Sequence, residues 1–472
     1  MTRRRRPGAS LRLAALLLPA ALLLGCDLGP DYQQPATALP AAWREPSGAS
    51  TALWPSADWW RGFGSPELDS LVVDAEDANY DLGAAIARVR EADAEARIAG
   101  AALLPSINAG ATGSSQRALF PTGHGNRITF PEYDLTLSAS YEVDFWGKNQ
   151  AAFAAAKATA LASRYDQQVV ALTVVTGVAT SYLQLLSLQD RLGVARENLA
   201  TAENVLEVIE GRRRLGTAMD LDVSQQRTVV AEQRAAIPPL EQQLSETMDA
   251  LAILLGKPPE QVKIAPASLA SLTAPAVAPG LPSELLARRP DVAEAEAQLV
   301  SANANIKVAR AQFFPNLALT AQGGFASLAL SNFLTPEGVV YSAAGSLTQP
   351  IFEGGALEGQ LQFSKARYDE LVQNYRKAVV SAFSNVEDAL ASVQRTAEQQ
   401  AAQEVTVAEA RRSYEIAQAR YRVGLTDLLT VLNTENALFP AEDTLVQVRL
   451  AHLQALVSLF NALGGGWQVE TG

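Results

Sequence analysis

The sequence predicts an α+β membrane protein with four β-strands and several very long helices, built by internal duplication. Three observations predict this fold class. Motifs recur about 208 residues apart, which is the separation of Gly216 and Gly424. Segments of alternating apolar and polar residues are typical of strands, and two alanine-rich stretches without proline are typical of rod-like helices.

The duplication is visible as pairs of short motifs in the two halves of the chain. The pairs are Asn79–Leu82 with Arg289–Val292, Leu104-Pro105 with Phe314-Pro315, Arg214–Gly216 with Arg422–Gly424, and Leu255-Gly256 with Leu463-Gly464. A period this long far exceeds the roughly 20 to 50 residues of a solenoid repeat. We therefore expect two domain copies that complete one structure.

This pattern divides the chain into six segments. They are a signal peptide (1–25), an extended equatorial segment (26–62), the first repeat (63–256), an equatorial linker (257–282), the second repeat (283–464) and a C-terminal tail (465–472). Each repeat should hold two strands followed by a long helical hairpin, with hairpin tips near residues 216 and 424.

The amino terminus has the features of a lipoprotein signal. Arginines at positions 3–6 and 12 precede an apolar stretch, Leu13–Leu24, that is too short to span a bilayer. Leu23-Leu24-Gly25-Cys26 forms a lipobox. Because Cys26 is the only cysteine, it can form neither an internal disulfide nor a thiolate metal cluster. We expect cleavage before Cys26 and covalent lipid, such as palmitate, on this residue.

The strands are expected at about 105–117 and 133–146 in the first repeat, and at about 315–328 and 339–352 in the second. In the clearest one, Leu135, Leu137 and Ala139 alternate with Thr136 and Ser138, which gives one apolar and one polar face. A single such segment is more common in soluble hairpins. Four of them, in a chain with a secretion signal and with the length needed to cross hydrocarbon, favour contact with lipid.

Four strands are too few to close a barrel, and open sheet edges are not tolerated in lipid. The chain is therefore expected to share strands with copies of itself.

The helical rods are expected from about residue 147 to 211 and from about 356 to 421, where no proline occurs. At about 1.5 Å per residue, each rod would reach about 100 Å. Gly216 and Gly424 should turn each rod into a return helix. Pro238-Pro239 and Pro440 should break the return helices at a joint about half-way along, because proline removes a backbone donor.

The proline-rich segments 27–55 and 257–282 are expected to pack around the middle of the rods. Four tryptophans lie in or near the first of them, and they are more plausible as packing anchors than as lipid-interface residues: Trp43, Trp54, Trp59 and Trp60.

Composition excludes several function classes. Loss of residues 1–25 removes five arginines and no acid, so the formal net charge moves from −12 to −17, which argues against nucleic-acid binding. The only histidines are His124 and His452, and we find no metal-ligand cluster, nucleophile triad or phosphate-binding glycine loop. We therefore expect no enzyme, no metal and no cofactor beyond the lipid. Beyond the signal, no run of about 18 apolar residues predicts a transmembrane helix.

Several motifs, in this order, resemble the TolC-like outer-membrane efflux proteins, specifically the OprM/NodT-type lipoprotein subgroup. They are Cys26–Tyr32, Ala287–Val292, Ala311–Pro315, Pro350–Gly355 and Tyr421–Leu425. The resemblance covers nearly the whole mature chain. It implies a homotrimer whose four strands per chain make a 12-stranded β-barrel, continued by a 12-helix α-barrel tunnel in the periplasm.

The resemblance also implies a function. Such proteins are passive outer-membrane exit ducts for drugs or other small toxic compounds. An inner-membrane pump of the resistance-nodulation-division (RND) type expels the compounds, and a periplasmic adaptor, or membrane fusion protein, joins pump and duct.

Residues at the tips can be carried over where the family's motifs match. Tyr421 and Asp222 match a hydrogen-bonded latch of the closed tip, and Leu429 matches a hydrophobic constriction. Asn433 stands where the family has a gating aspartate, so a ring of neutral amides should attract cations less than carboxylates would.

Further tip residues allow two interpretations each. Asp220 and Asp427 could join Asp222 in an acidic ring around the lumen, or they could simply cap helices. Two short motifs match the family's adaptor contacts. Their glycines could instead merely allow tight turns, and the two interpretations are compatible: Leu215-Gly216-Thr217 and Val423-Gly424-Leu425.

Two other functions and several points stay open at this stage. A type I protein-secretion duct would share the fold, and a coiled-coil lipoprotein scaffold would explain Cys26 and the rods but not the strands. Asp27 is a retention signal for the inner membrane in some Gram-negative bacteria, so an outer-membrane location requires a host with a different sorting rule. The substrate and the particular pump and adaptor are not encoded in recognisable residues.

Overall fold

The computed structural model describes residues 28–37, 40–44, 53–119 and 127–468. The signal peptide and Cys26 lie outside the described residues. The helices are α2 (Pro66–Ala78), α3 (Tyr80–Ala101), α4 (Lys148–Arg214), α5 (Asp220–Leu254), α6 (Pro282–Leu285), α7 (Pro290–Ala311), α8 (Ala356–Arg422) and α9 (Leu428–Ala462). The strands are β1 (Ser106–Leu119), β2 (Arg127–Val143), β3 (Asn316–Ser327) and β4 (Val339–Thr348). Short 3-10 helices occupy Trp59–Phe63, Pro259–Gln261, Leu269–Ser271, Leu286–Arg288, Leu330–Asn332 and Pro336–Gly338.

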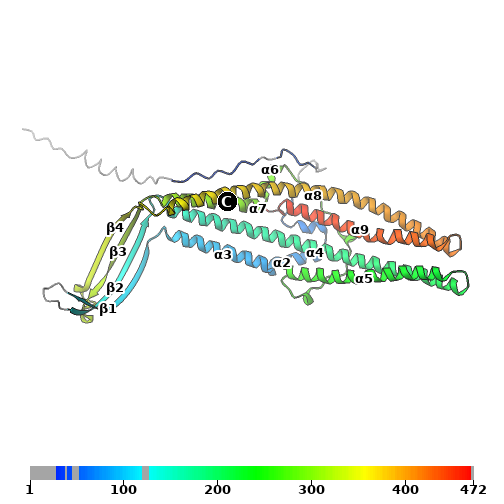
Figure 1. The fold of residues 1–472 in the computed structure, drawn as a ribbon, viewed down its shortest axis with the longest axis horizontal. Coiled ribbons are helices and arrows are strands. Elements are labelled where there is room, and N and C mark those ends of the chain that lie inside the picture. Colours follow the sequence, from blue (N-terminus) through cyan, green and yellow to red (C-terminus); the bar gives the residue numbers. More distant parts are fainter. Residues whose placement is uncertain (1–27, 38–39, 45–52, 120–126, 469–472) are drawn as a thin grey trace, which may run out of the picture. The chain divides into compact units, whose positions relative to one another are not determined.

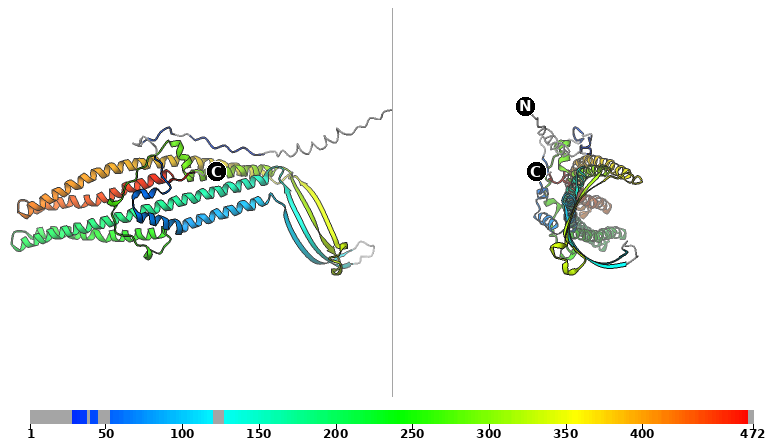
Figure 2. Two further views of the ribbon diagram at one scale, coloured as in Figure 1. Left: turned by 180° about the vertical axis from the view of Figure 1, so that it is seen from behind. Right: turned by 90° about the vertical axis from the view of Figure 1, so that its left-hand side faces the viewer.

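The duplication is visible in the lengths of the paired helices. α3 and α7 have 22 residues each, α4 and α8 have 67 each, and α5 and α9 have 35 each. Both rods expected from the sequence are therefore present at full length. The hairpins α4–α5 and α8–α9 run beside each other in Figures 1 and 2.

The chain forms two compact units, and each unit takes segments from both repeats. The first contains residues 28–35, 89–163 and 295–375, and the second contains the described residues of 36–88, 164–294 and 376–468. The repeats therefore interleave, because strands from both halves join one sheet.

The sheet in the first unit is antiparallel with the order β1-β2-β3-β4, and it is curved (Figure 2, right). Leu137 of β2 lies opposite Ala109 and Gly323, whereas its neighbour Ser138 lies opposite Asn108 and Gln322. Residues directly opposite each other share a face of the sheet. The register therefore places the apolar rows on one face and the polar rows on the other, as the alternation predicts.

Two strands end earlier than the sequence suggests. β2 stops at Val143 because the Asp144 carboxylate accepts hydrogen bonds from the backbone N–H groups of Asn149 (3.0 Å) and Gln150 (2.7 Å), which caps the start of α4. β4 stops at Thr348 rather than near residue 352, two residues before Pro350, which lacks an N–H group for a sheet ladder. β2 also begins earlier than expected, at Arg127.

The predicted breaks in the return helices are wrong. α5 continues through Pro238 and Pro239, and α9 continues through Pro440. The three prolines are exposed, while the adjacent Leu240 and Phe439 are buried in the core of the second unit. Packing of these neighbours holds both halves of each helix, so the lost backbone bonds do not end it.

The tryptophans of the amino-terminal segment pack as expected. Trp59 is buried and stacks on Phe460 of α9 with ring centroids 4.9 Å apart. Trp43 Nε1 donates a hydrogen bond to the Gly280 carbonyl (2.7 Å), and Trp54 Nε1 donates to Glu284 (3.2 Å). All these contacts lie within the second unit and tie the segment to the linker and the helices.

One helix of the described chain is long and apolar enough to cross a membrane by length and composition alone, namely α4. Abundant alanine, valine and leucine give α4 this composition without a continuous apolar run. The expectation that no helix of the chain spans a membrane stays a prediction. Val178, Leu185 and Leu186 of α4 are fully buried in the core of the second unit.

Candidate tip gate and channel surfaces

The two hairpin tips turn on glycines in the left-handed conformation. Gly216 has φ of +74° and Gly424 has φ of +77°. The Gly216 N–H donates to the Arg213 carbonyl (2.9 Å), and the Gly424 N–H donates to the Tyr421 carbonyl (3.0 Å). Residues with a Cβ are strained at such φ values. The tight-turn interpretation of both glycines is therefore confirmed.

Apolar side chains beside these glycines are exposed. Leu215, Val423 and Leu425 have 81%, 70% and 77% of their surface accessible. Together with the bare backbone of Gly216 and Gly424, they form a surface that a partner can approach closely. Thr217 is tied back to its own turn, because its hydroxyl donates to the Arg212 carbonyl (3.1 Å). The role of these motifs in adaptor binding stays a prediction.

Tyr421 is held by an arginine of the other hairpin. Arg212, at the end of α4, donates from one guanidinium nitrogen to the carbonyls of Tyr421 (2.6 Å) and Arg422 (3.1 Å). Its guanidinium also lies 4.3 Å from the centroid of the Tyr421 ring, in a cation–π arrangement. The Tyr421 side chain is only 6% exposed. Arg212 thus joins the tip ends of α4 and α8 within one chain.

The expected hydrogen bond between Tyr421 and Asp222 is not formed within the described chain. Asp222 instead accepts from the backbone N–H of Met219 (2.8 Å), because it occupies the third position of α5, where the preceding backbone donor needs a partner. Burial raises the pKa of Tyr421; the Arg212 charge opposes this shift and the nearby Asp222 charge adds to it. The sequence reasoning missed Arg212 because it stands in a run of three arginines that gave no sign of its partner.

Asp220 and Asp427 both have local partners. Asp220 forms an ion pair with Arg213 at the exposed surface. Asp427 is the N-cap of α9 and accepts from the Thr430 hydroxyl (2.6 Å) and the Thr430 N–H (3.0 Å), and these bonds lower its pKa. The capping interpretation of Asp427 is therefore confirmed, whereas an acidic ring around a lumen stays a prediction.

Leu429 and Asn433 lie one turn apart on α9 and share its exposed face. Leu429 is 58% exposed, while Leu428 and Val431 beside it are buried in the core of the second unit. The exposed side chains of Leu429 and Asn433 can therefore face another part of an assembly. Their gating roles stay predictions.

A buried polar cluster near the tips was not foreseen from the sequence. Glu435 of α9 and Gln226 of α5 both have no exposed surface. Gln226 Nε2 donates to Glu435 Oε2 (3.4 Å) and to the carbonyl of Ala202 in α4 (3.1 Å). The sequence contains one sign of this cluster. Glu435 follows the buried Val431 by four residues and so occupies a position of α9 that normally holds an apolar side chain.

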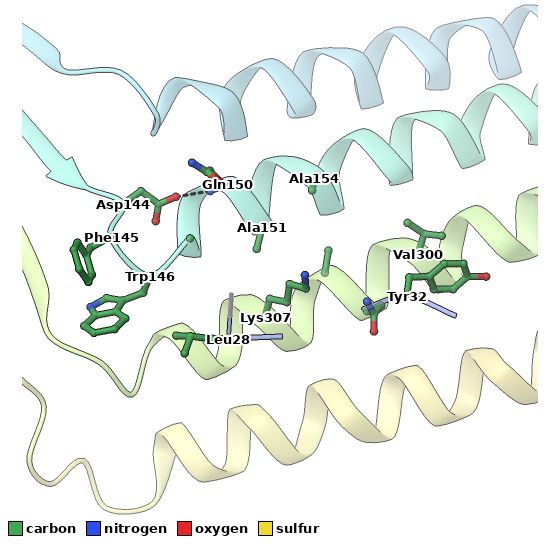
Figure 3. A pocket seen from close by; sticks show the side chains of 13 residues that line it. Leu28, Tyr32, Asp144, Phe145, Trp146, Gln150, Ala151, Ala154, Val300 and Lys307 are labelled. Atoms are coloured by element: carbon green, nitrogen blue, oxygen red, sulfur yellow. Dashed lines mark hydrogen bonds between the residues drawn. The ribbon is translucent and has the colours of Figure 1, made fainter. Parts of the chain in front are cut away.

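A cavity of about 470 Å³ lies in the first unit, where β2 meets α4 and α7 (Figure 3). Its lining includes Leu28, which is two residues beyond Cys26, together with Trp146 and Lys307. Trp146 Nε1 donates to the Pro315 carbonyl (2.8 Å) and thereby holds the ends of the two repeats' strands together. Across the residues that the structure describes, no cluster of histidine, cysteine or acidic side chains could hold a metal ion.

Comparison with known proteins decides the family. A model of the outer membrane efflux protein family matches residues 71–257 and 281–465. The chain belongs to this family. Its relatives include the pyoverdine export outer membrane protein OpmQ of Pseudomonas aeruginosa, with 44% identity over 96% of this chain and 97% of the relative. The toluene efflux pump outer membrane protein TtgF of Pseudomonas putida is 36% identical over 94% of this chain and 95% of that protein.

Solved structures of membrane channels share the fold. The transmembrane channel CusC matches with a TM-score of 0.84 and 31% identity, over 93% of this chain and 100% of that one. The open-state MtrE outer membrane channel of Neisseria gonorrhoeae matches with a TM-score of 0.85 and 27% identity, over 95% of this chain and 100% of that one. The predicted fold class and the predicted role as an outer-membrane efflux channel are thereby confirmed.

Proposed function

We propose that the chain is the lipid-anchored, trimeric exit duct of a tripartite efflux system, of the OprM/NodT type. An RND-type pump in the inner membrane supplies the energy, a periplasmic adaptor joins the pump to the duct, and the duct itself is passive and catalyses no reaction. The observation that carries this proposal is the four-stranded sheet, which has one apolar face and joins two long helical hairpins in one chain.

The trimer follows from the edges of the sheet. In the described chain, β1 and β4 are the two ends of the strand order, so each has one edge without a partner strand. Each unpaired backbone group costs several kcal/mol in hydrocarbon. Pairing β4 of one copy with β1 of the next satisfies both edges, and three copies close a barrel of twelve strands.

The apolar face of the sheet supports contact with lipid. Tyr341 and Leu347 of β4 are 88% and 70% exposed, which is unusual for such side chains in water. Outer-membrane barrels carry an outward apolar band of this kind with a polar interior. The polar rows that include Ser138 and Gln322 would then line the lumen.

The anchor follows from the path of the first described residues. Arg310 of α7 donates to the Leu28 carbonyl (3.1 Å), and Asn303 of α7 donates to the Pro30 carbonyl (3.0 Å). These bonds fix the chain just after Cys26 to the unit that carries the sheet. A lipid on Cys26 would therefore reach the membrane that the sheet crosses, which supports the outer membrane over retention by Asp27.

The two alternatives explain less. A coiled-coil lipoprotein scaffold has no use for a sheet with an apolar face. A type I protein-secretion duct would share the fold, but the relatives named above are components of small-molecule export. The 44% identity to OpmQ supports testing pyoverdine as one cargo, and the likeness to TtgF supports testing toluene as another.

The test combines assembly, conduction and export. Native mass spectrometry of the purified lipoprotein should give a trimer, and planar bilayers should show discrete channels. Expression in a strain lacking its own outer-membrane channel, together with a cognate pump and adaptor, should restore export of at least one cargo. A monomer without conductance would defeat the duct and favour the scaffold. Export of a protein cargo alone would favour the type I duct.

A further inference from the structure

Glu435 is a carboxyl group in an apolar seam. Its neighbours along α9, Val431, Leu432 and Leu438, belong to the buried core near the hairpin tips, and Glu435 itself has no exposed surface. Burying an ionised carboxylate at such a position costs free energy unless water or a cation interacts with it. The side chain therefore requires either a counter-charge or a proton.

The hydrogen bonds around Glu435 are incomplete. The Gln226 amide nitrogen serves both Glu435 Oε2 (3.4 Å) and the Ala202 carbonyl (3.1 Å). Gln226 Oε1 and Glu435 Oε1 are both buried and lack a partner among the described residues. An amide oxygen and a carboxylate oxygen can only accept, so neither atom can satisfy the other.

A proton on Glu435 supplies the missing donor. The acid O–H can donate to Gln226 Oε1 while the amide N–H donates to the other acid oxygen, which completes an acid–amide pair. We propose that the neutral acid of Glu435 pairs with Gln226 to fasten α9 to α5 near the tips, and that release of this proton to water loosens the tip packing. The proposal concerns packing within one chain, and it rests on the proposed function only where a loosened tip is equated with a more open duct.

Among the residues that the structure describes, no cation faces Glu435. Gln226 of α5 faces Glu435 and also bonds the Ala202 carbonyl of α4. Tyr414 of α8 is a polar neighbour of the carboxyl, and its hydroxyl accepts a hydrogen bond from Gln418. Arg422 acts on Tyr414, whose pKa is raised mainly by burial and then by Glu435. Burial raises the pKa of Glu435 to about 7, and the polar neighbours Gln226 and Tyr414 only partly oppose this shift.

The direction of the pH effect follows from that pKa. Below the ordinary value of 4.5 the acid is neutral in both packed and loosened tips, and packing carries no penalty. As pH rises from 4.5 to about 7, the loosened tip ionises first, so the ratio of packed to loosened tips falls by up to about tenfold per pH unit. Above about 7 both forms are charged and the penalty stays constant. The tips should therefore be tightest at and below about pH 4.5 and loosest above about pH 7.

Hydrogen exchange of the purified full-length protein at about pH 5 and pH 8, corrected for intrinsic exchange rates, tests this. Peptides covering residues 223–232 and 428–440 should lose protection at the higher pH, by tenfold or more. Glu435→Gln should keep strong protection at both pH values, because its amide N–H replaces the acid donor. Glu415→Gln, an exposed change on α8, should respond as the wild type does.

A second measurement covers the case in which Glu435→Gln does not fold. Infrared difference spectra of the wild type between the two pH values should show a buried carboxylic-acid band that disappears as pH rises through about 7. Protection that does not depend on pH, an unchanged pH response in folded Glu435→Gln, or absence of that band would each overturn the proposal. Failure of the duct proposal would show separately, as a trimer without conductance.

Discussion

Arg212 and Tyr421 join the two hairpin tips of one chain, although they lie 209 positions apart in the sequence. One guanidinium nitrogen of Arg212 lies 2.6 Å from the Tyr421 carbonyl oxygen, and the group also covers the Tyr421 ring at 4.3 Å. Arg212 therefore donates to two backbone carbonyls of α8 and lies over an aromatic ring of the same helix. These contacts join α4 to α8 at the point where each helix ends.

Loss of this contact should open the tip. Hydrogen bonds to a charged group contribute about 1.5–3 kcal/mol, so Arg212→Ala should increase single-channel conductance or open time without unfolding the helices. Tyr421→Phe should have a small effect, because the ring and the backbone carbonyl remain. Arg213→Ala, which removes only the exposed pair with Asp220, is the matched control. Equal conductance in Arg212→Ala and Arg213→Ala would show that Arg212 does not hold the tip.

Replacing a glycine by alanine should have opposite effects on stability at the turn residue Gly216 and at the helical residue Gly193. At Gly216 a Cβ would meet no atom within 4 Å, so the cost of Gly216→Ala is the strain of positive φ alone, about 1–2 kcal/mol. At Gly193, inside α4, a Cβ also has open space, and Gly193→Ala should stabilise the helix by about 0.5–1 kcal/mol. Thermal unfolding monitored by circular dichroism should move the melting temperature in opposite directions. A shift of the same sign for both variants would contradict this account of the turn.

The two faces of β2 predict different outcomes for two adjacent arginine substitutions. Leu137→Arg should reduce trimer yield, because a charge on the lipid face costs about 2–4 kcal/mol near the bilayer midplane. Ser138→Arg points to the other face, so it should assemble normally and alter conductance or ion selectivity. Native mass spectrometry of the extracted membrane fraction measures the yield of each. If Ser138→Arg is the variant that fails to assemble, the faces are assigned the wrong way round.

Cys26 should anchor the protein without building the channel. A Cys26→Ala variant behind a cleavable signal peptide should still form trimers, because pairing of strand edges, rather than acyl chains, completes the sheet. Its release from membranes by mild detergent should be easier than that of the lipidated protein. Recovery of monomer alone in native mass spectrometry would show that the lipid is required for assembly.

The sequence by itself determined the features that depend on local periodicity. The two long helices follow from long alanine-rich stretches without proline, the turns follow from Gly216 and Gly424, and the two faces of β2 follow from its alternation. Helical and strand periods fix which side chains share a face whatever the rest of the chain does. These elements were therefore predictable.

Only the tertiary structure decided the features that depend on partners distant in sequence. The return helices continue through Pro238 and Pro440 because buried neighbours hold both sides of each proline. Tyr421 pairs with Arg212 because two hairpin ends meet, while Asp222 is occupied by the start of its own helix. The burial and proton affinity of Glu435 depend on Gln226 of α5 and Tyr414 of α8. No local pattern can set the free energy of a group whose surroundings are assembled only on folding.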